Sequence, residues 1–429
     1  MITIRKPEIV ELGDQTRIQS IIDFDGAKKL LWFEVPTEYA QYLCPERSDA
    51  YVIGLLNHAM RHKQDITCEV PMGEELHYRI STYLIPSLAN HSKGLYHTKI
   101  VADLDSTPIQ NAGGVGTGMS CGIDAMHVMA NEAANGDLYP SLKVTHLVHY
   151  RNLGIHGFGQ RGKIMHEGIE GNARKFANEV GLPIISTDSN YAEIMSEGLL
   201  HWHHALTHTY SSIFATYMLQ KLWKIYYYAS GGHDFSGFSL VNSEKYSPAN
   251  YELLSLDCFS TQSLKIFSEG GAKTRFDKTK TVVTYPPAKK YLNVCIYAPK
   301  NCGKCVKCVQ TLASLDALNQ LDEFRAVFDV DYYKSHRWQY YCRLYGESIR
   351  SDTFSTKDVC RVLSPRMNLF HRLGGLFVFV KWFTIDIVEW CSSKVPSLSK
   401  RYSEHVDHVL IKEAEALARN VSDEKNDNF

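Results

Sequence analysis

Several features that would assign this chain to a broad class are missing from its sequence. No apolar segment follows the first residues, so neither secretion nor a disulfide scaffold is expected. The most apolar stretch, residues 373–383, is shorter than a bilayer span and contains Lys381, so it predicts a buried helix. The net charge is only −1, which favours neither nucleic acid nor an anionic membrane as a partner. We therefore expect a cytoplasmic protein without a membrane segment.

Two common phosphate-binding motifs are also missing. No Gly-Lys-Ser or Gly-Lys-Thr ends the glycine-rich stretch 113–129, as a Walker loop requires, and residues 116–121, GTGMSC, lack the last glycine of a dinucleotide fingerprint. The stretch does contain a run of small residues that leads directly into a helical pattern near Ile123. A tight turn at a helix N-terminus directs unpaired N–H groups and the positive helix dipole to one point, so this stretch predicts a phosphate site.

The apolar pattern predicts three parts. Residues 1–105 mix strands with one helix and predict an α+β unit that binds a substrate or partner; the expected strands are 30–35, 76–81 and 97–102, and the expected helix is 49–60. Residues 106–328 alternate strands and helices, which predicts an α/β fold with a doubly wound parallel sheet. Residues 329–429 predict a C-terminal helical region with a disordered tail.

In the predicted parallel sheet, ligands are expected at the carboxyl ends of the strands. The predicted strands end near residues 119, 150, 188 and 229. Arg151 and Asn152 are expected beside the phosphate site, and Gly231 and Gly232 are expected to face the same crevice.

Two clusters of polar side chains allow more than one interpretation. His201, His204 and His208 share one face of a predicted helix, where a metal site is conceivable but a helix face over a cleft is favoured. Residues 270–280 contain four cations, which form either a solvated face or phosphate contacts. Arg275 is the best candidate for phosphate, because a guanidinium matches its oxygens, and Lys278 is the second.

Four cysteines form the sharpest motif. Cys302, Cys305 and Cys308 follow one another at CxxC spacing, and Cys295 lies one short loop earlier. Four thiolates at such spacing favour a closed, tetrahedral, structural Zn²⁺ site over a redox pair, which needs only two cysteines.

Residues 120–125, SCGIDA, are similar to SGGxDS, the pyrophosphate-binding signature of the PP-loop, with Cys121 in place of a glycine and Ala125 in place of a serine. With this motif, the chain resembles the 7-cyano-7-deazaguanine synthase (QueC-like) branch of the PP-loop ATP pyrophosphatases. The four cysteines and the helix that follows them complete a resemblance over residues 110–325.

The resemblance implies an enzyme that uses ATP to adenylate a carboxylate or amide oxygen, which an amine or ammonia then attacks. It implies ATP, Mg²⁺ and Zn²⁺ as cofactors. Asp124, Ser120, Arg275 and Lys278 are the expected catalytic residues. The expected nucleotide contacts are Gly116, Thr117, Gly118, Met119, Ser120, Cys121, Gly122, Ile123, Asp124, Arg151 and Asn152.

Partners and rival functions are also expectations of the resemblance. The substrate would be a small carboxylate or a deazaguanine, and related proteins in anti-phage defence clusters imply a protein partner encoded nearby. The first rival is a scaffold or binding protein with a degenerate PP-loop, because Cys121 and Ala125 depart from the signature. The second is a tRNA sulfur transferase, against which the near-neutral charge argues.

Overall fold

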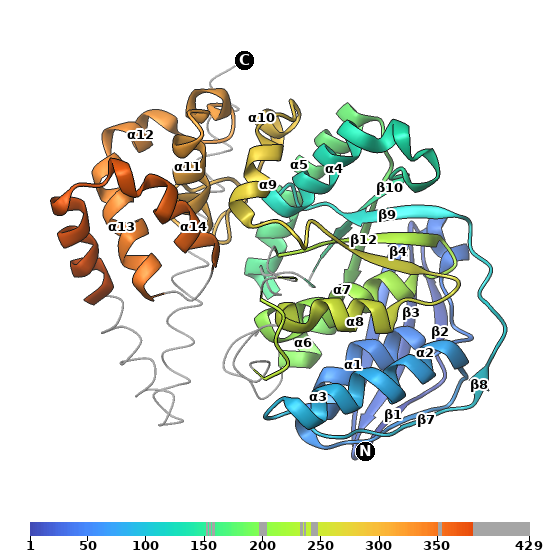
Figure 1. Cartoon of the computed structure of the whole chain (residues 1–429). Helices are drawn as coiled ribbons and strands as arrows, with labels where there is room; N and C mark the ends of the chain where they lie inside the picture. The colour runs from blue at the N-terminus through green and yellow to red at the C-terminus, as the bar shows by residue number, and fades with distance from the viewer. Residues whose placement is uncertain are drawn as a thin grey trace. The chain divides into compact units, whose positions relative to one another are not determined.

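The computed structural model describes residues 1–151, 153, 156, 159–196, 204–231, 235, 237–241, 248–350 and 354–380 (Figure 1). Its contacts divide the chain into two compact units, each assembled from separate stretches of sequence. Unit 1 comprises Met1–Met119, Glu132–Phe158 and Gly181–Ala272, and unit 2 comprises Ser120–Asn131, Gly159–Val180 and Lys273–Phe429.

The centre of unit 1 is a parallel sheet, which confirms an α/β fold. The strand order is β13 (Lys265–Glu269), β12 (Trp223–Ala229), β9 (Gly114–Gly118), β10 (His146–Tyr150) and β11 (Ile184–Ser189). Among these parallel strands, β9 comes first along the chain. Strands β10 and β11 follow on one side of it, and β12 and β13 then follow on the other side. The order therefore reverses between β9 and β12, which is where open α/β sheets bind ligands at the carboxyl ends of their strands.

An antiparallel extension continues the same sheet. Strand β11 pairs with β4 (Ala27–Pro36), which pairs in turn with β3 (Gln15–Phe24). Beyond them lie β2 (Glu8–Leu12), β1 (Ile2–Ile4), β5 (Ile66–Cys68) and β7 (Ile100–Val101), while β6 (Met72–Gly73) and β8 (Leu104–Asp105) form a separate pair. One sheet thus combines strands from both sides of residue 105, where the sequence suggests a boundary.

Helices α1 (Asp49–His62) and α7 (His204–Met218) pack against each other in the core of unit 1 (Figure 1). Their approach is close at Gly54, where an added Cβ would lie 2.9 Å from the Phe214 ring. The expected helix at 49–60 is confirmed as α1. The other helices of unit 1 are α2 (Glu74–Arg79), α3 (Ile85–His91), α6 (Tyr191–Ser196) and α8 (Glu252–Phe259).

The strand expected at 76–81 is wrong, because this segment is helical. Helix α2 continues through a π-helical turn, η2 (Ile80–Leu84), into α3. Leu76, Ile80, Leu84 and Leu88 are all buried and recur every four residues, which matches one helix face. The alternation of polar and apolar residues over 76–81 covers too few residues to outweigh that longer period.

Unit 2 is built mainly from helices. They are α4 (Ile123–Asn135), whose first nine residues belong to unit 2, α5 (Gly159–Val180), α9 (Arg275–Val282), α10 (Ala288–Tyr291), α11 (Val306–Ala317), α12 (Val330–Ser335), α13 (Arg337–Arg350) and α14 (Phe354–Leu363). Ala313 of α11, Leu344 of α13 and Leu363 of α14 meet in a buried apolar cluster. Short 3₁₀ turns occur in both units at Thr37–Tyr42, Gly136–Leu138, Pro140–Leu142, Pro248–Tyr251, Leu321–Phe324 and Ser364–Arg366.

Residues 373–380, the described part of the apolar segment 373–383, form a helix that is not buried as its composition predicts. Leu373 is 53% exposed and Phe377 is 76% exposed. The helix presents its glycines to α13: a Cβ added to Gly375 would lie 2.8 Å from the Cys342 carbonyl oxygen. Among the described residues, no helix is both long and apolar enough to cross a membrane.

Candidate anion site and metal centre

The turn before α4 holds a residue other than glycine in the left-handed region. Cys121 stands at φ +60°, in the left-handed region, and its side chain is fully buried. Its carbonyl oxygen accepts a hydrogen bond from the Asn293 N–H at 2.8 Å, and Ser120 Oγ accepts one from the Gly122 N–H at 3.4 Å. The first N–H groups of a helix have no partner within the helix, so this turn leaves donors for an anion.

Asp124, in the first turn of α4, contacts both of the basic residues predicted to act with it. Arg275 Nη2 lies 2.5 Å from Asp124 Oδ2, and Lys278 Nζ lies 3.2 Å from Asp124 Oδ1. The Lys278 side chain is fully buried. Helix α9 presents both cations, since Arg275 is its first residue and Lys278 follows one turn later, and Thr274 caps this helix by accepting the Asp277 N–H at 3.2 Å.

The ionisation of these groups follows from burial and from the neighbouring charges. Burial alone would raise the pKa of Asp124, but Arg275, Lys278 and Lys307 together lower that pKa to about 2. Burial and the charges of Lys273 and Lys278 lower the pKa of His127 to about 4, so its imidazole is neutral at pH 7.

Basic groups outnumber the acidic one in this cluster. His127 Nε2 lies 3.1 Å from Lys273 Nζ, which brings a further ammonium to α4. Four cations, from Lys273, Arg275, Lys278 and Lys307, thus act on one carboxylate and one neutral imidazole. The surplus of positive charge beside a helix N-terminus suits an anion with several charges, such as a polyphosphate.

The structure gives the glycines of β9 a packing role. A Cβ added to Gly116 would lie 2.7 Å from the Trp223 ring, and one added to Gly114 would lie 2.8 Å from the Leu222 carbonyl oxygen. Thr117 is fully buried, and its hydroxyl donates to the Tyr227 carbonyl oxygen at 3.0 Å. Close approach of β9 to β12 therefore explains these small residues without a ligand.

The remaining predicted nucleotide contacts are placed as follows. Gly118 and Met119 end β9 in unit 1, Ile123 is buried at the start of α4, and Arg151 follows the neighbouring strand β10. Asn152 and Gly232 lie outside the described residues.

Mg²⁺ binding by Asp124 stays a prediction. Each oxygen of Asp124 contacts a cation, so a Mg²⁺ ion would share this carboxylate with Arg275 and Lys278. Among the described residues, only the four cysteines bring three or more His, Cys, Asp or Glu ligand atoms together.

The predicted cysteines converge as their spacing indicates. The Sγ atoms of Cys295, Cys302, Cys305 and Cys308 all lie within 4.8 Å of one another. Tetrahedral Zn–S bonds of about 2.3 Å would separate the sulfurs by about 3.8 Å, so the cluster fits one metal ion such as zinc. Hydrogen bonding within the cluster, chiefly with Cys295, lowers the pKa of Cys302 to about 7 and also lowers the pKa of Cys305, while the same kind of contact raises the pKa of Cys295 and Cys308.

Backbone N–H groups around the cluster point at the sulfurs. Cys295 Sγ accepts from Ala298 at 3.2 Å, Cys302 Sγ from Cys305 at 3.3 Å, and Cys305 Sγ from Cys308 at 3.4 Å. Donors of this kind stabilise negative sulfur and orient it, which is the second-shell support that a metal site needs. The last of these bonds also caps α11.

Two further side chains, Asn301 and Tyr340, hold the segment that carries the four cysteines, and no spacing rule identifies them. The Asn301 amide donates to the carbonyl oxygens of Leu292 and Val327 at 2.8 and 3.0 Å, and its oxygen accepts from the Val294 N–H. Tyr340 of α13 donates to the Gly303 carbonyl oxygen at 2.7 Å. Their partners depend on tertiary contacts, so sequence analysis misses them.

The predicted histidine face is only partly described. His201 lies outside the described residues, while the His204 and His208 rings lie 5.4 Å apart. His208 Nε2 contacts the buried carboxylate of Glu252 at 3.1 Å, and Thr209 donates to the same oxygen at 2.6 Å. Glu252 is a polar core residue that the sequence analysis does not identify.

Because comparison with known proteins gives no relative, a function has to be inferred from this geometry. The chain matches no protein-family model, no curated protein and no solved structure.

Proposed function

We propose that the protein is an ATP-dependent enzyme of the PP-loop type that adenylates a carboxylate or amide oxygen for attack by an amine or ammonia. The observation that carries the proposal is the cluster of Arg275 and Lys278 around Asp124 at the start of α4. Buried cations beside a helix N-terminus favour a polyphosphate, and ATP is the expected source of one. The PP-loop resemblance of residues 120–125 supports the same ligand.

The proposed site favours pyrophosphate as the leaving group. It has no Walker lysine to stabilise a γ-phosphoryl group in transfer, while its cations can hold the β- and γ-phosphates together. A substrate carboxylate oxygen then attacks the α-phosphorus, and the bond to the bridging oxygen breaks with its electron pair going to pyrophosphate. The amine next attacks the carbonyl carbon and expels AMP. The products are AMP, pyrophosphate and an amide.

The rest of the proposal comes from the QueC-like resemblance. The substrate is then a deazaguanine carboxylate or another small carboxylate, and a protein encoded nearby is the proposed partner. Four thiolates, from Cys295, Cys302, Cys305 and Cys308, would hold Zn²⁺ as a structural ion that cross-links the loop before α11.

A scaffold with a degenerate loop is the second candidate. Ala125, where the signature has serine, is buried and offers no hydroxyl to a phosphate. Cys121, where the signature has glycine, holds a positive φ at an energetic cost. A protein that had lost catalysis would tolerate both changes.

Nucleotide analysis after incubation separates the candidates. The protein is incubated with ATP, Mg²⁺, 7-carboxy-7-deazaguanine and ammonium, with and without the product of a neighbouring gene. We expect AMP and pyrophosphate, and we expect Arg275→Met to lower the rate at least tenfold. Lys280→Met is the matched control, because Lys280 lies on the same helix but pairs with Asp277 at the surface. ADP and phosphate as products would exclude adenylation, and ATP binding without cleavage would favour the scaffold.

A further inference from the structure

Unit 1 contains a cavity of about 240 Å³ at the N-terminal ends of α1 and α2. Arg47, Asp49, Gly73, Glu75, Tyr217 and Gln220 are among its lining residues. At about 30 Å³ for each water molecule in the liquid, the cavity has room for roughly eight waters or one small organic molecule. It is independent of the site at the start of α4, which belongs to unit 2.

Gly73 lies beside two buried charged side chains that line this cavity, Arg47 and Asp49. The side chains of Arg47 and Asp49 are only 4% and 3% exposed. A Cβ added to Gly73 would lie 3.1 Å from Arg47 Nη1 and 3.4 Å from Asp49 Oδ2. Gly73 has φ −58°, which any L-residue adopts, so its backbone conformation does not require glycine. Its missing side chain instead leaves space beside both charged groups.

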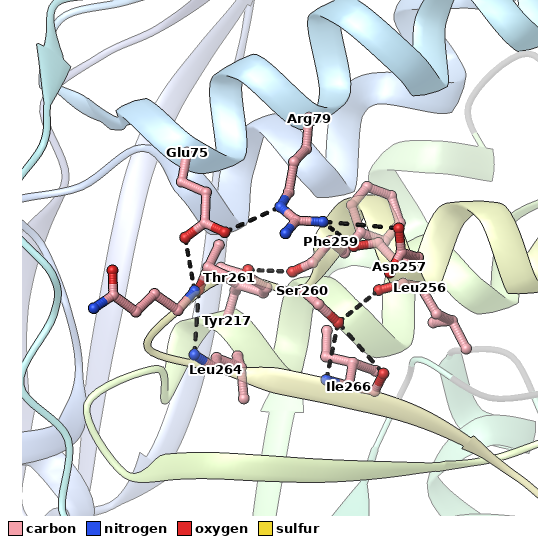
Figure 2. Close-up of polar contacts among 11 residues, drawn as sticks. Glu75, Arg79, Tyr217, Leu256, Asp257, Phe259, Ser260, Thr261, Leu264 and Ile266 are labelled. Atoms are coloured by element: carbon pink, nitrogen blue, oxygen red, sulfur yellow. Dashed lines mark hydrogen bonds and ion pairs between the residues drawn. The ribbon is translucent and has the colours of Figure 1, made fainter.

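Ion pairs account for two of the cavity's carboxylates. Asp105 pairs with Arg47 at 2.7 Å. Glu75 pairs with Arg79 at 3.1 Å and also accepts the Gln262 N–H at 2.7 Å, as the dashed lines of Figure 2 show for Glu75. Asp49 accepts the Gly73 N–H at 2.8 Å and also hydrogen-bonds with the Gln220 side chain, and Arg47, which pairs with Asp105, is the cation that acts on it. One guanidinium therefore serves two carboxylates, and the burial of Asp49, which outweighs these contacts, raises its pKa to about 6.

Hydrogen bonds also hold Tyr217, Thr261 and Leu264, which line the cavity. Figure 2 shows the Tyr217 hydroxyl directed at the Phe259 carbonyl oxygen and Arg79 extended from Glu75 toward Asp257. Thr261 Oγ1 accepts the Leu264 N–H at 3.2 Å. Because these polar groups are already paired with one another, Asp49, which shares Arg47 with Asp105, is the buried carboxylate left to face a bound cation.

The charge and spacing of the lining groups select among ligand classes. Carboxylates outnumber cations, since Glu74 also lines the cavity, so an anion is disfavoured. A metal ion needs several ligand atoms at one point, and among the described residues only the four cysteines converge in that way. An organic ammonium fits, because its three N–H donors need one carboxylate and neutral acceptors such as the Gln220 amide oxygen.

We propose that this cavity binds a small primary amine as its ammonium ion. Asp49 is the counter-charge, and the missing side chain of Gly73 leaves space for the ligand beside it. The site is separate from the proposed ATP site and does not depend on adenylation. A molecule of fewer than about ten non-hydrogen atoms fits the volume.

Calorimetric titration with propylammonium chloride at pH 7.5 tests the proposal on the full chain. We expect saturable binding with a Kd of about 1 mM or tighter. Asp49→Asn should weaken binding at least tenfold, because it removes the counter-charge. Gly73→Ala should also weaken binding at least tenfold, because its methyl group fills the space beside Asp49 while the charge stays in place. This second variant tests the proposal if Asp49→Asn does not fold.

Matched controls separate these effects from general ones. Asp25→Asn removes an exposed carboxylate, and Gly171→Ala adds a methyl group where nothing lies within 4 Å, so both should bind propylammonium as the wild type does. Propan-1-ol and propionate should not bind. Equal binding of propan-1-ol, unchanged binding by a folded Gly73→Ala protein, or no saturable heat with propylammonium would each overturn the proposal.

Discussion

Cys121 carries a backbone strain that is normally relieved by glycine. The left-handed conformation at φ +60° costs an L-residue about 1–2 kcal/mol. Elsewhere, glycine in place of alanine lowers stability, because it raises the entropy of the unfolded chain. At this position the strain should reverse that order.

The prediction at Cys121 is a comparison of two variants that both lack the thiol. Cys121→Gly should be more stable than Cys121→Ala by about 1 kcal/mol, because only alanine keeps the strained Cβ. Urea unfolding measures both free energies. An alanine variant equal to or more stable than the glycine variant would show that residue 121 is not strained.

Asp124 predicts a dependence of stability on pH. Its folded pKa of about 2 lies below the 3.8 of an unperturbed aspartate, so its ion pairs stabilise the fold above pH 4 and lose that effect as the pH falls toward 2. At about 1.4 kcal/mol for each pKa unit, the contribution is about 2 kcal/mol. Wild type should therefore exceed Asp124→Asn by about this amount at pH 6, and by progressively less at pH 4 and pH 3. A difference that stays constant over this range would mean that the carboxylate is not held by Arg275 and Lys278.

Wild type and Asp124→Asn also test whether Asp124 acts on a bound anion through the two cations or through Mg²⁺. If Asp124 only pairs with Arg275 and Lys278, its carboxylate competes with an anion for them. Inorganic pyrophosphate should then bind Asp124→Asn without Mg²⁺ at least as tightly as it binds wild type. If Asp124 instead holds Mg²⁺, only the wild-type protein should gain affinity when Mg²⁺ is added.

At the scale of elements, β9 shows how one sequence pattern can serve two purposes. A glycine-rich strand end predicts a phosphate loop, but Gly116 also lies against the Trp223 ring of the neighbouring strand β12. Gly116→Ala would place a methyl group 2.7 Å from that ring, and the resulting overpacking should cost about 1–3 kcal/mol.

Gly118→Ala is the matched control for this strand. Its added Cβ would lie 3.4 Å from the Tyr226 hydroxyl, so the strand should accept it with little loss. Thermal unfolding of both variants gives the comparison. A Gly116→Ala protein of wild-type stability that no longer binds ATP would instead assign Gly116 to the nucleotide.

The segment 74–91 shows where local patterns mislead. Two overlapping periods are present, and the longer one decides because Leu76, Ile80, Leu84 and Leu88 each reach the core only from a helix. The apolar stretch 373–380 shows the opposite case. Composition predicts burial, but Gly374 and Gly375 set which face meets α13, so Phe377 lies on the exposed face.

For the whole molecule, the two compact units predict a local response to metal removal. The four-cysteine cluster lies in unit 2, and a structural metal contributes its binding free energy to folding. We expect about one zinc ion for each chain. After chelation, hydrogen exchange should speed up in α11, whose N-cap is Cys305, while β9 and β10 of unit 1 keep their protection.

Metal analysis and a second variant complete this test. Cys305→Ser should lose both zinc and the protection of α11, whereas Cys258→Ser, a buried cysteine of unit 1, should keep the metal. Freshly purified wild-type protein without zinc or another bound metal would contradict the metal centre.

Features that depend on neighbours along the chain can be predicted from the sequence. The cysteine ligands lie within fourteen residues, so their spacing alone predicts one metal ion, and the alternation of β9, α4, β10, α5 and β11 predicts a parallel sheet. The choice of Arg275 and Lys278 as candidates for phosphate contacts also comes from local properties, because it uses only their charge and side-chain chemistry.

Contacts between groups that are distant in the sequence follow only from the fold. Arg275 and Lys278 reach Asp124 across 151 and 154 residues, and the cavity of unit 1 joins Asp49 and Gly73 to Gln220. Such contacts depend on the order of strands in the sheet and on close packing at glycines, neither of which is encoded in a local period. For the same reason, the glycines of β9 and the left-handed Cys121 acquired their physical explanation only when their neighbours in space were known.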